Sequence, residues 1–222
     1  MNVSQIKSFE AAPWLLEKHY AGRIPPISFA FGAYDEGNLI GVVTYGIPAS
    51  ATLRAGICGS RWSQSVIELN RLVCENHPNI ASQLVGRSLQ MLPKPSIVVS
   101  YADTKQGHIG YVYQACNFIY TGLSAKRTNW KIKGLEHLHG QTIADMSKGQ
   151  KDRANWMRLK FGDDFYLEDR SRKHRYIFFV GSRIDKKNMC KDLAYKTAPY
   201  PKGESRRYNA GGIVRTQSIL NF

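Results

Sequence analysis

The alternation of apolar and polar positions predicts a hairpin and a strand in the first third of the chain. Residues 26–34 and 38–46 are β-branched and aromatic runs joined by a short Asp-Glu-Gly-Asn linker, which predicts a β-hairpin. Over residues 63–73, Val66, Glu68 and Asn70 alternate with mostly apolar positions. This alternation predicts a half-buried strand whose polar side chains face a cleft.

Helices and strands are expected to follow in turn. Residues 81–92 place apolar side chains on one helical face, with Asn79 as the N-cap and Pro93 as the stop. We expect a strand at 96–102, a helical stretch at 107–118, and strands at 117–123 and 126–133. This order predicts an α/β (α+β) fold with a mixed sheet and helices on its faces.

The second half of the chain has a different character. Residues 141–161 predict one or two polar helices, residues 173–180 predict a buried strand, and the tail 199–222, rich in Pro, Gly and Arg, predicts a loop. A chain of 222 residues is short for two full independent domains. We therefore expect one core over residues 1–135 and a basic C-terminal extension over residues 136–222, packed on the core.

The positive charge is concentrated in the second half of the chain. Residues 1–124 hold 9 Lys/Arg and 7 Asp/Glu, whereas residues 125–222 hold 22 and 10. Such a segment favours polyanions; a solvated basic face and an anionic membrane surface are the alternatives. Interleaved aromatic residues, Trp130, Trp156, Tyr166 and Tyr176, favour nucleic acid. The expected DNA contacts are Lys126, Arg127, Lys131, Arg172, Lys173 and Arg175.

The compartment follows from what the sequence lacks. No run approaches the roughly 20 apolar residues that span a bilayer, and the first residues lack the layout of a signal peptide, so we expect a cytoplasmic protein. The cysteines are widely spaced and form no CxxC pair, which predicts neither disulfides nor structural zinc.

The element order over residues 66–122 resembles the GNAT acyltransferase superfamily. In that family, the turn after the cleft strand receives the pyrophosphate of acetyl-CoA at a helix N-terminus; here this turn is 76–81, with His77-Pro78-Asn79 in place of the family's glycines. The resemblance implies acetyl-CoA or a related donor. The expected donor contacts are Asn79, Ile80, Ala81, Ser82, Arg87 and Ser88, and the alternative for the last two is a polar outer helix face.

A second motif supports this resemblance. Tyr113-Gln-Ala-Cys-Asn117-Phe118 resembles the family pattern of Tyr, three residues, Gly and Phe, with Asn117 in the glycine position because Asn also accepts left-handed backbone geometry. The resemblance implies that Tyr113 is the acid that protonates the leaving thiolate. A tyrosine packed under the strand is the alternative.

A narrower resemblance covers most of residues 14–135. It rests on Trp14, His19-Tyr20, Arg23-Ile24-Pro25, the GVVTYG segment at 41–46, Glu68–Leu72, Gly86–Leu89, Ser100–Asp103 and Gly107-His108. In order and spacing these resemble the Mom family of phage DNA-modification proteins, which have a GNAT-like fold. The resemblance implies a phage-encoded transferase in the host cytoplasm. It would add a carbamoylmethyl group to the N6 amine of adenine in DNA and so protect the DNA from host restriction.

The same resemblance implies a catalytic set of His19, Tyr20, Arg71, Asp103 and Tyr113. Asp103 is the expected base, with capping of a following helix as its alternative, and Arg71 is expected to pair with a phosphate or with Asp103. The family's association with iron makes His19, Tyr20 and Asp103 the expected iron ligands; a packed His-Tyr pair is the alternative. Because N6 is paired inside a duplex, the base must be flipped or unpaired, and Tyr20, Tyr101 and Tyr111 are the expected stacking residues.

Two other functions stay open at this point. One is an ordinary GNAT N-acetyltransferase acting on a small amine or an RNA, for which the Tyr113 motif is sufficient. The other is a DNA-binding protein without activity, built on an acyltransferase core that has lost its glycines. The donor, the sequence context and strandedness of the DNA, and the choice between monomer and homodimer also stay open.

Overall fold

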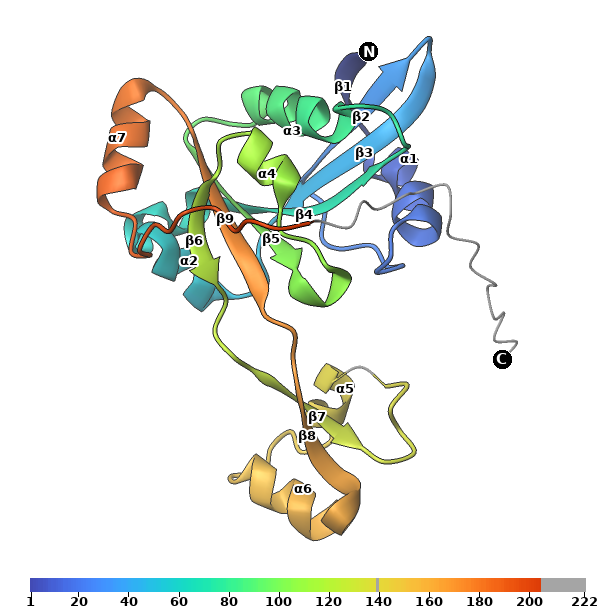
Figure 1. Ribbon diagram of the computed structural model, residues 1–222. Coiled ribbons are helices and arrows are strands. Elements are labelled where there is room, and N and C mark those ends of the chain that lie inside the picture. Colours follow the sequence, from blue (N-terminus) through green and yellow to red (C-terminus); the bar gives the residue numbers. More distant parts are fainter. Residues whose placement is uncertain (139, 205–222) are drawn as a thin grey trace. The chain divides into compact units, whose positions relative to one another are not determined.

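The structure is a computed structural model that describes residues 1–138 and 140–204, and it has two compact units (Figure 1). Of the described residues, the first unit contains Met1–Leu123 and His174–Glu204, and the second contains those within Ser124–Lys173. None of the described helices is long and apolar enough to cross a membrane.

The first unit is built on a seven-stranded sheet of order β1-β2-β3-β4-β5-β9-β6. Its strands are β1 Asn2–Ile6, β2 Phe29–Asp35, β3 Asn38–Gly46, β4 Val66–Cys74, β5 Ser96–Asp103, β6 Ile119–Leu123 and β9 Lys173–Val180. Strands β1 to β4 are antiparallel neighbours, β4 and β5 are parallel, and β6 and β9 are antiparallel. The predicted mixed sheet is confirmed.

The predicted hairpin is β2–β3. Asp35 pairs with Asn38, so Glu36 and Gly37 form a two-residue turn, and both have positive φ angles of 47° and 84°. Two-residue hairpin turns of this kind need left-handed backbone at both positions, which glycine accepts without strain.

Helices cover both faces of this sheet. They are α1 Ser8–Pro13, η1 Trp14–Lys18, α2 Ala51–Cys58, η2 Ser60–Ser65, α3 Ile80–Met91, η3 Thr104–Gln106, α4 Tyr111–Ala115 and α7 Arg183–Lys191. Side chains alternate between faces along each strand. Val43 and Val98 therefore pack in the cluster under α3 and α4, whereas Val42 packs against α1, and Ile97 and Val99 pack against α2 and η2.

The second unit has its own small core. Its elements are β7 Thr128–Ile132, α5 Gly140–Asp145, α6 Arg153–Phe161, η4 Gly162–Asp164 and β8 Phe165–Asp169. Strands β7 and β8 form an antiparallel ribbon, and Ile132, Ile143, Met157 and Phe165 are buried together. The ends of the unit meet, because the Ser124 N–H donates to the Lys173 carbonyl at 2.8 Å and the Lys173 N–H donates to Ser124 Oγ at 2.9 Å.

The boundaries in the structure lie at 124 and 173, whereas the sequence placed one boundary at 135. The strand predicted at 173–180 is β9, which lies in the main sheet between β5 and β6 and buries Tyr176 and Ile177 completely. The extension expected from 136 onward is thus divided between an inserted unit and a strand of the core. Of the expected tail loop, residues 205–222 lie outside the described residues, and residues 199–204 form no helix or strand.

Candidate functional site

The site lies where β4 and β5 separate. The parallel pairing joins Val66–Leu69 to Ile97–Ser100, although β4 runs on to Cys74 and β5 to Asp103. A β-bulge lies opposite Thr44 and Tyr45, which pair with Arg71 and Leu69, so Asn70 is the extra residue of β4. The bulge shifts the alternation by one residue and puts Arg71 on the same face as Glu68, which a regular strand would not do.

Asn70 also anchors the segment that carries His19 and Tyr20. Its amide Nδ2 donates to the Pro26 carbonyl at 2.9 Å, and its Oδ1 accepts the Thr44 hydroxyl at 2.6 Å. The chain at Pro26 passes so close to β3 that a Cβ on Gly46 would lie 1.9 Å from the Pro26 carbonyl oxygen. Glycine at position 46 therefore lets this segment lie against the sheet.

Tyr20 lies at the centre of a cluster of polar side chains. Its ring stacks on His19 with a centroid distance of 4.3 Å and meets His108 edge-on at 6.1 Å. Burial and the nearby charge of Asp103 raise the pKa of Tyr20, while the cation of Arg71 acts in the opposite direction. Burial also lowers the pKa of His108, against the influence of Asp103. These side chains are thus close enough to share an electrostatic environment, as the sequence analysis expected.

Arg71 is a partly buried cation in this cluster. Burial and the neighbouring Arg23 lower the pKa of Arg71, while Tyr20 and Glu68 oppose this shift. Its Nη1 donates to the Asn70 carbonyl at 2.6 Å, but within the described residues its buried Nε has no hydrogen-bond partner. A buried donor without a partner costs free energy that an acceptor on a ligand would recover.

Tyr113 approaches the cluster around Tyr20 from the face of the sheet that α3 and α4 cover. It packs with the cluster under α3 and α4, and its hydroxyl is hydrogen bonded to Ser100. The pKa of Tyr113 is raised to about 12, chiefly by burial; the hydrogen bond to Ser100 opposes this rise, and Tyr20 and Glu68 contribute to it. Its phenol therefore keeps its proton at neutral pH, as an acid requires.

Asp103 caps the short helix η3, which ends before Gly107, whereas its alternative role was to cap a helix that starts near Gly107. Its Oδ1 accepts the Lys105 N–H at 2.9 Å at the start of η3, and its backbone carbonyl accepts the His108 N–H at 3.2 Å. One carboxylate oxygen is thus fixed in direction by the turn. A fixed carboxylate among Tyr20 and His108 remains compatible with work as a base.

The expected iron site is not supported. Nowhere in residues 1–138 and 140–204 do three or more His, Cys, Asp and Glu side chains lie together as a metal site. The buried His19 accepts the Ala21 N–H at 3.0 Å through its Nδ1. No step of the chemistry below involves iron.

The turn expected to bind the acyl donor contains no glycine, but Asn79 there has the left-handed backbone conformation that glycine favours. Asn79 precedes α3 with φ 59° and ψ 4°, and its side chain does not cap the helix. Asn79 is the N-cap residue of α3, as the sequence predicted, but its side chain makes no capping hydrogen bond. Asn117 likewise has a φ of 58°, as its place in the tyrosine motif predicted. The first turn of α3 still offers unpaired N–H groups, which suit an anion.

The remaining residues expected to contact the acyl donor lie in three settings. Ala81 and Ser82 lie in the first turn of α3, and the Ser82 carbonyl accepts the Cys116 thiol at 3.3 Å. Ile80 and Ser88 are buried, and Ser88 Oγ lies 2.6 Å from the Tyr45 hydroxyl. Arg87 is exposed and donates to the Met1 carbonyl at 3.0 Å.

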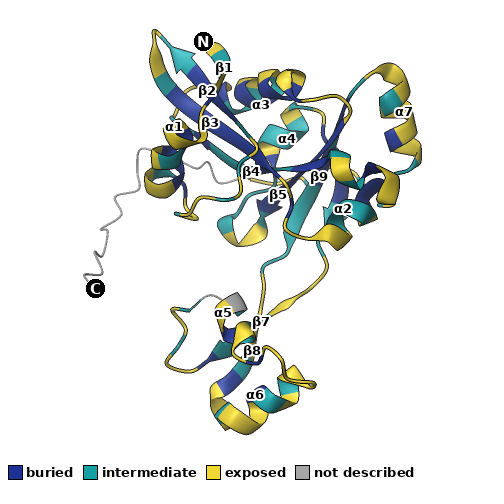
Figure 2. Cartoon of the chain, turned by 180° about the vertical axis from the view of Figure 1, so that it is seen from behind, coloured by how far each residue is buried: buried dark blue, intermediate teal, exposed yellow. Residues whose placement is uncertain are grey.

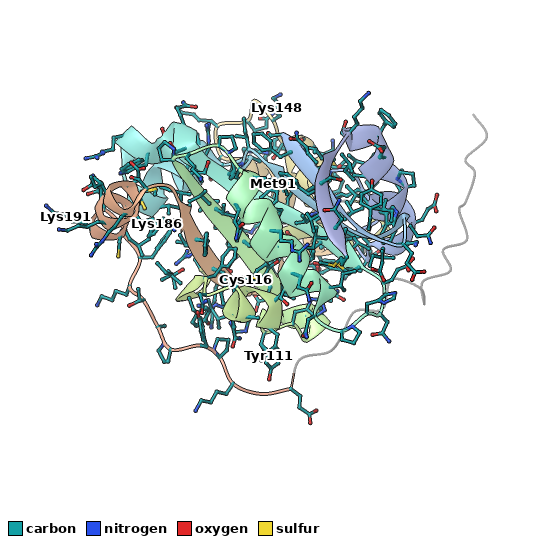
Figure 3. The ribbon with its side chains drawn as sticks, turned by 90° about the horizontal axis from the view of Figure 1, so that it is seen from above. Met91, Tyr111, Cys116, Lys148, Lys186 and Lys191 are labelled. Atoms are coloured by element: carbon teal, nitrogen blue, oxygen red, sulfur yellow. The ribbon has the colours of Figure 1, made fainter. Side chains whose placement is uncertain are left out.

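A separate groove of about 510 Å³ runs beside α3. Its apolar wall includes Leu89 and Phe178, and its cations are Lys94 and Lys186. Lys186 on α7 and Cys116 after α4, which both line it, are labelled in Figure 3.

The residues expected to bind DNA lie in several settings. Lys126 and Arg127 are exposed, whereas Lys131 donates to the Glu136 carbonyl at 3.0 Å, and Arg172 donates to the Ser124 carbonyl at 2.7 Å. Lys173 begins β9.

Arg175 is part of the packing of the first unit. Its Nε donates to Thr121 Oγ1 at 2.8 Å, and its guanidinium lies 3.3 Å from the centroid of the Tyr195 ring. Two of the aromatic residues interleaved with the basic ones also pack internally, because Tyr176 is fully buried and Trp130 contacts Phe165 edge-on at 5.3 Å.

Comparison with known proteins decides the family. The model of the Mom protein family matches residues 1–202. The chain belongs to the Mom protein family. One Mom relative is the methylcarbamoylase Mom of Escherichia phage Mu, which is 26% identical over 209 residues, covering 91% of this chain and 84% of the relative.

Solved structures that this Mom-family chain resembles include three acetyltransferases. A GNAT-family acetyltransferase from Bacillus cereus has a TM-score of 0.41 at 11% identity, covering 82% of this chain and 98% of that one. The ribosomal-protein-S18-alanine N-acetyltransferase from Escherichia coli has a TM-score of 0.43 at 8% identity, covering 82% and 94%. A Bacillus subtilis acetyltransferase in complex with CoA has a TM-score of 0.43 at 10% identity, covering 81% and 98%.

Two residues of the cluster were missed as catalytic candidates. Glu68 influences both Arg71 and Tyr113, and Arg23 influences Arg71. The alternation of polar positions on β4 pointed to Glu68, but a regular strand would have placed it on the face opposite Arg71. Arg23 lies in a segment without regular structure, so no periodicity could place it.

Proposed function

We propose that this protein is a transferase that modifies DNA by adding a carbamoylmethyl group to the N6 amine of adenine. The observation that carries the proposal is the convergence of Tyr20, Arg71, Asp103 and Tyr113 where β4 and β5 separate, in a chain of the Mom family. The name of the phage Mu relative, a methylcarbamoylase, supports the choice of group.

The side chains have distinct roles in this proposal. Asp103 accepts one proton from N6 as the nitrogen bonds to the transferred carbon, and Tyr113 gives its hydroxyl proton to the leaving atom. The donor, a carrier related to acetyl-CoA, must already hold the carbamoylmethyl group; N6 attacks its CH2 carbon and the leaving atom departs with the bonding electron pair, whereas acetyl-CoA itself would deliver only an acetyl group. A proton passing from Asp103 to the Tyr113 phenolate through solvent restores both groups.

Two further groups would position the substrates. The buried Nε of Arg71 and the nearby Arg23 would hold an anionic oxygen of the donor or of a DNA phosphate. The partly exposed ring of Tyr20 would stack on a base that has left the duplex. The first turn of α3 would receive the anionic part of the donor.

The test is mass analysis of nucleosides from the DNA of cells that express the protein. We expect a modified deoxyadenosine with the wild type and its loss with Asp103→Asn. Transfer of a simple acetyl group would give a product of different mass, which separates the two donor chemistries. Unmodified DNA in every preparation would exclude the proposal and favour an acetyltransferase acting on another amine.

A further inference from the structure

One face of α6 carries polar and apolar side chains that the second unit does not use. Met157 is fully buried in the core of this unit. Because an α-helix has about 3.6 residues per turn, Asn155, Arg158 and Leu159 share one face, on the side of the helix opposite Met157. All three are exposed, and Figure 2 shows the exposed residues of α6 in yellow.

These three side chains differ from their neighbours in having no internal role. Leu159 is 79% exposed, and neither Asn155 nor Arg158 uses its side chain in a hydrogen bond or ion pair with the part of the chain that the structure describes. In contrast, Arg153 donates from Nε to Ser147 Oγ at 3.1 Å, and the Lys160 ammonium lies 4.6 Å from the centroid of the Trp156 ring.

The charge of the second unit suits a polyanion. Residues 124–173 carry 12 Lys/Arg and 7 Asp/Glu. Within α6 there are three cations and no carboxylate, and the adjacent Asp152 caps the helix by accepting the Asn155 N–H at 3.0 Å. A negatively charged protein surface would match this charge but would not account for the particular side chains on the exposed face.

The chemistry of those side chains matches base edges. In the major groove, Asn pairs with adenine through N6 and N7, Arg pairs with guanine through O6 and N7, and an apolar side chain contacts the thymine methyl group. The major groove is also wide enough to admit an α-helix.

We propose that α6 enters the major groove of duplex DNA and that Asn155, Arg158 and Leu159 read the bases there. The helix then selects the sequence next to which the protein acts. That these sequences are where modification occurs rests on the proposed function, but selective binding by α6 does not.

The test is a binding selection with the purified full-length protein. A library of duplexes with randomised sequence is incubated with the wild type, Asn155→Ala, Arg158→Ala and Lys160→Ala, and the bound DNA is sequenced. Lys160→Ala is the matched control, since it removes one cation from the same helix on a different face. Helix content and thermal midpoint are measured for each variant to confirm that it folds.

We expect the wild type to enrich particular bases and Arg158→Ala to lose roughly 5- to 150-fold of its preference at one base position. Asn155→Ala should lose its preference at a different position, and Lys160→Ala should keep the wild-type preferences. An equal fall in affinity for all sequences in Arg158→Ala, unchanged preferences in both face variants, or a wild type without preference would each overturn the proposal.

The nucleoside analysis separates this inference from the proposed function. A wild type that selects sequences through α6 but leaves deoxyadenosine unmodified would uphold the reading helix and reject the enzymatic proposal. Modified deoxyadenosine, together with sequence preferences that do not depend on α6, would uphold the enzymatic proposal and reject the role of α6 in reading the sequence.

Discussion

The substitution Tyr113→Phe tests whether Tyr113 is only a packing residue or also the catalytic acid. Tyr113 is partly buried, and its hydroxyl is hydrogen bonded to Ser100, whose own hydroxyl donates to the Leu69 carbonyl at 3.1 Å. Tyr113→Phe keeps the ring and removes one hydrogen bond, because Ser100 retains its bond to Leu69. The expected loss of stability is about 1 kcal/mol, which for a protein of this size lowers the thermal midpoint by roughly 2–4 °C.

The expected loss of activity is far larger. If Tyr113 is the acid, its removal should lower the rate of modification by about 10²- to 10⁴-fold. Rates are measured by mass analysis of nucleosides at several times after expression begins, with the amount of folded protein determined in parallel. Burial raises the pKa of Tyr113 to about 12, so the wild-type rate should show no loss from ionisation of this group between pH 7 and about 9.

Tyr120→Phe is the matched control for this experiment. Tyr120 is buried, at 8% exposure, and its hydroxyl lies 2.8 Å from Nδ1 of His174, away from the cluster around Tyr20. It should lose a similar amount of stability and keep its activity. If Tyr113→Phe modifies DNA as fast as Tyr120→Phe, then Tyr113 is a packing residue and the acid must be another group.

Three further predictions concern stability, pH and DNA binding. Gly110→Ala should lower the free energy of unfolding, measured in urea, by about 2 kcal/mol more than Gly122→Ala. Both glycines have a φ near +80°, but of the two only Gly110 would place a Cβ 2.4 Å from the ring of the buried Tyr176. Equal losses of stability would contradict this packing. The pKa of Tyr113 is raised in the fold, so its contribution to stability should be complete below about pH 10 and lost as the pH rises towards 12, and urea midpoints that stay constant over that range would contradict this. Replacing the exposed Lys126 and Arg127 by Glu should weaken DNA binding. The slope of log binding constant against log salt concentration should become shallower by about 1 for each lost phosphate contact. The same charge change on α7 is the control, and an unaltered slope would show that these two residues do not contact phosphates.

The sequence by itself determined the elements whose signals are local. The hairpin β2–β3, the helix α3 and the strand β5 lie within a few residues of their predicted bounds. Alternation, a helical apolar face and turn residues act over short distances, so they can be interpreted without the rest of the chain. The positive φ of Asn117 was predictable for the same reason, because the asparagine tolerates that backbone conformation wherever the chain requires it.

The family resemblance in the sequence also named side chains that the structure brings close together. Tyr20, Arg71, Asp103 and Tyr113, which lie far apart along the chain, do come together. The residue order alone did not assign their chemistry, and the capping role of Asp103 and the internal bond of His19 became clear only with their partners in place.

Tertiary structure alone decided three features. Strand β9 lies beside β5 although some 70 residues separate them, because its buried Tyr176 and Ile177 complete both faces of the sheet core. The insertion of 124–173 follows from that pairing. The bulge at Asn70 puts Glu68 and Arg71 on one face, since pairing with β3, and not the pattern of β4 itself, sets where an extra residue is accommodated. Local periodicity specifies what each segment becomes, whereas long-range pairing specifies which side chains meet.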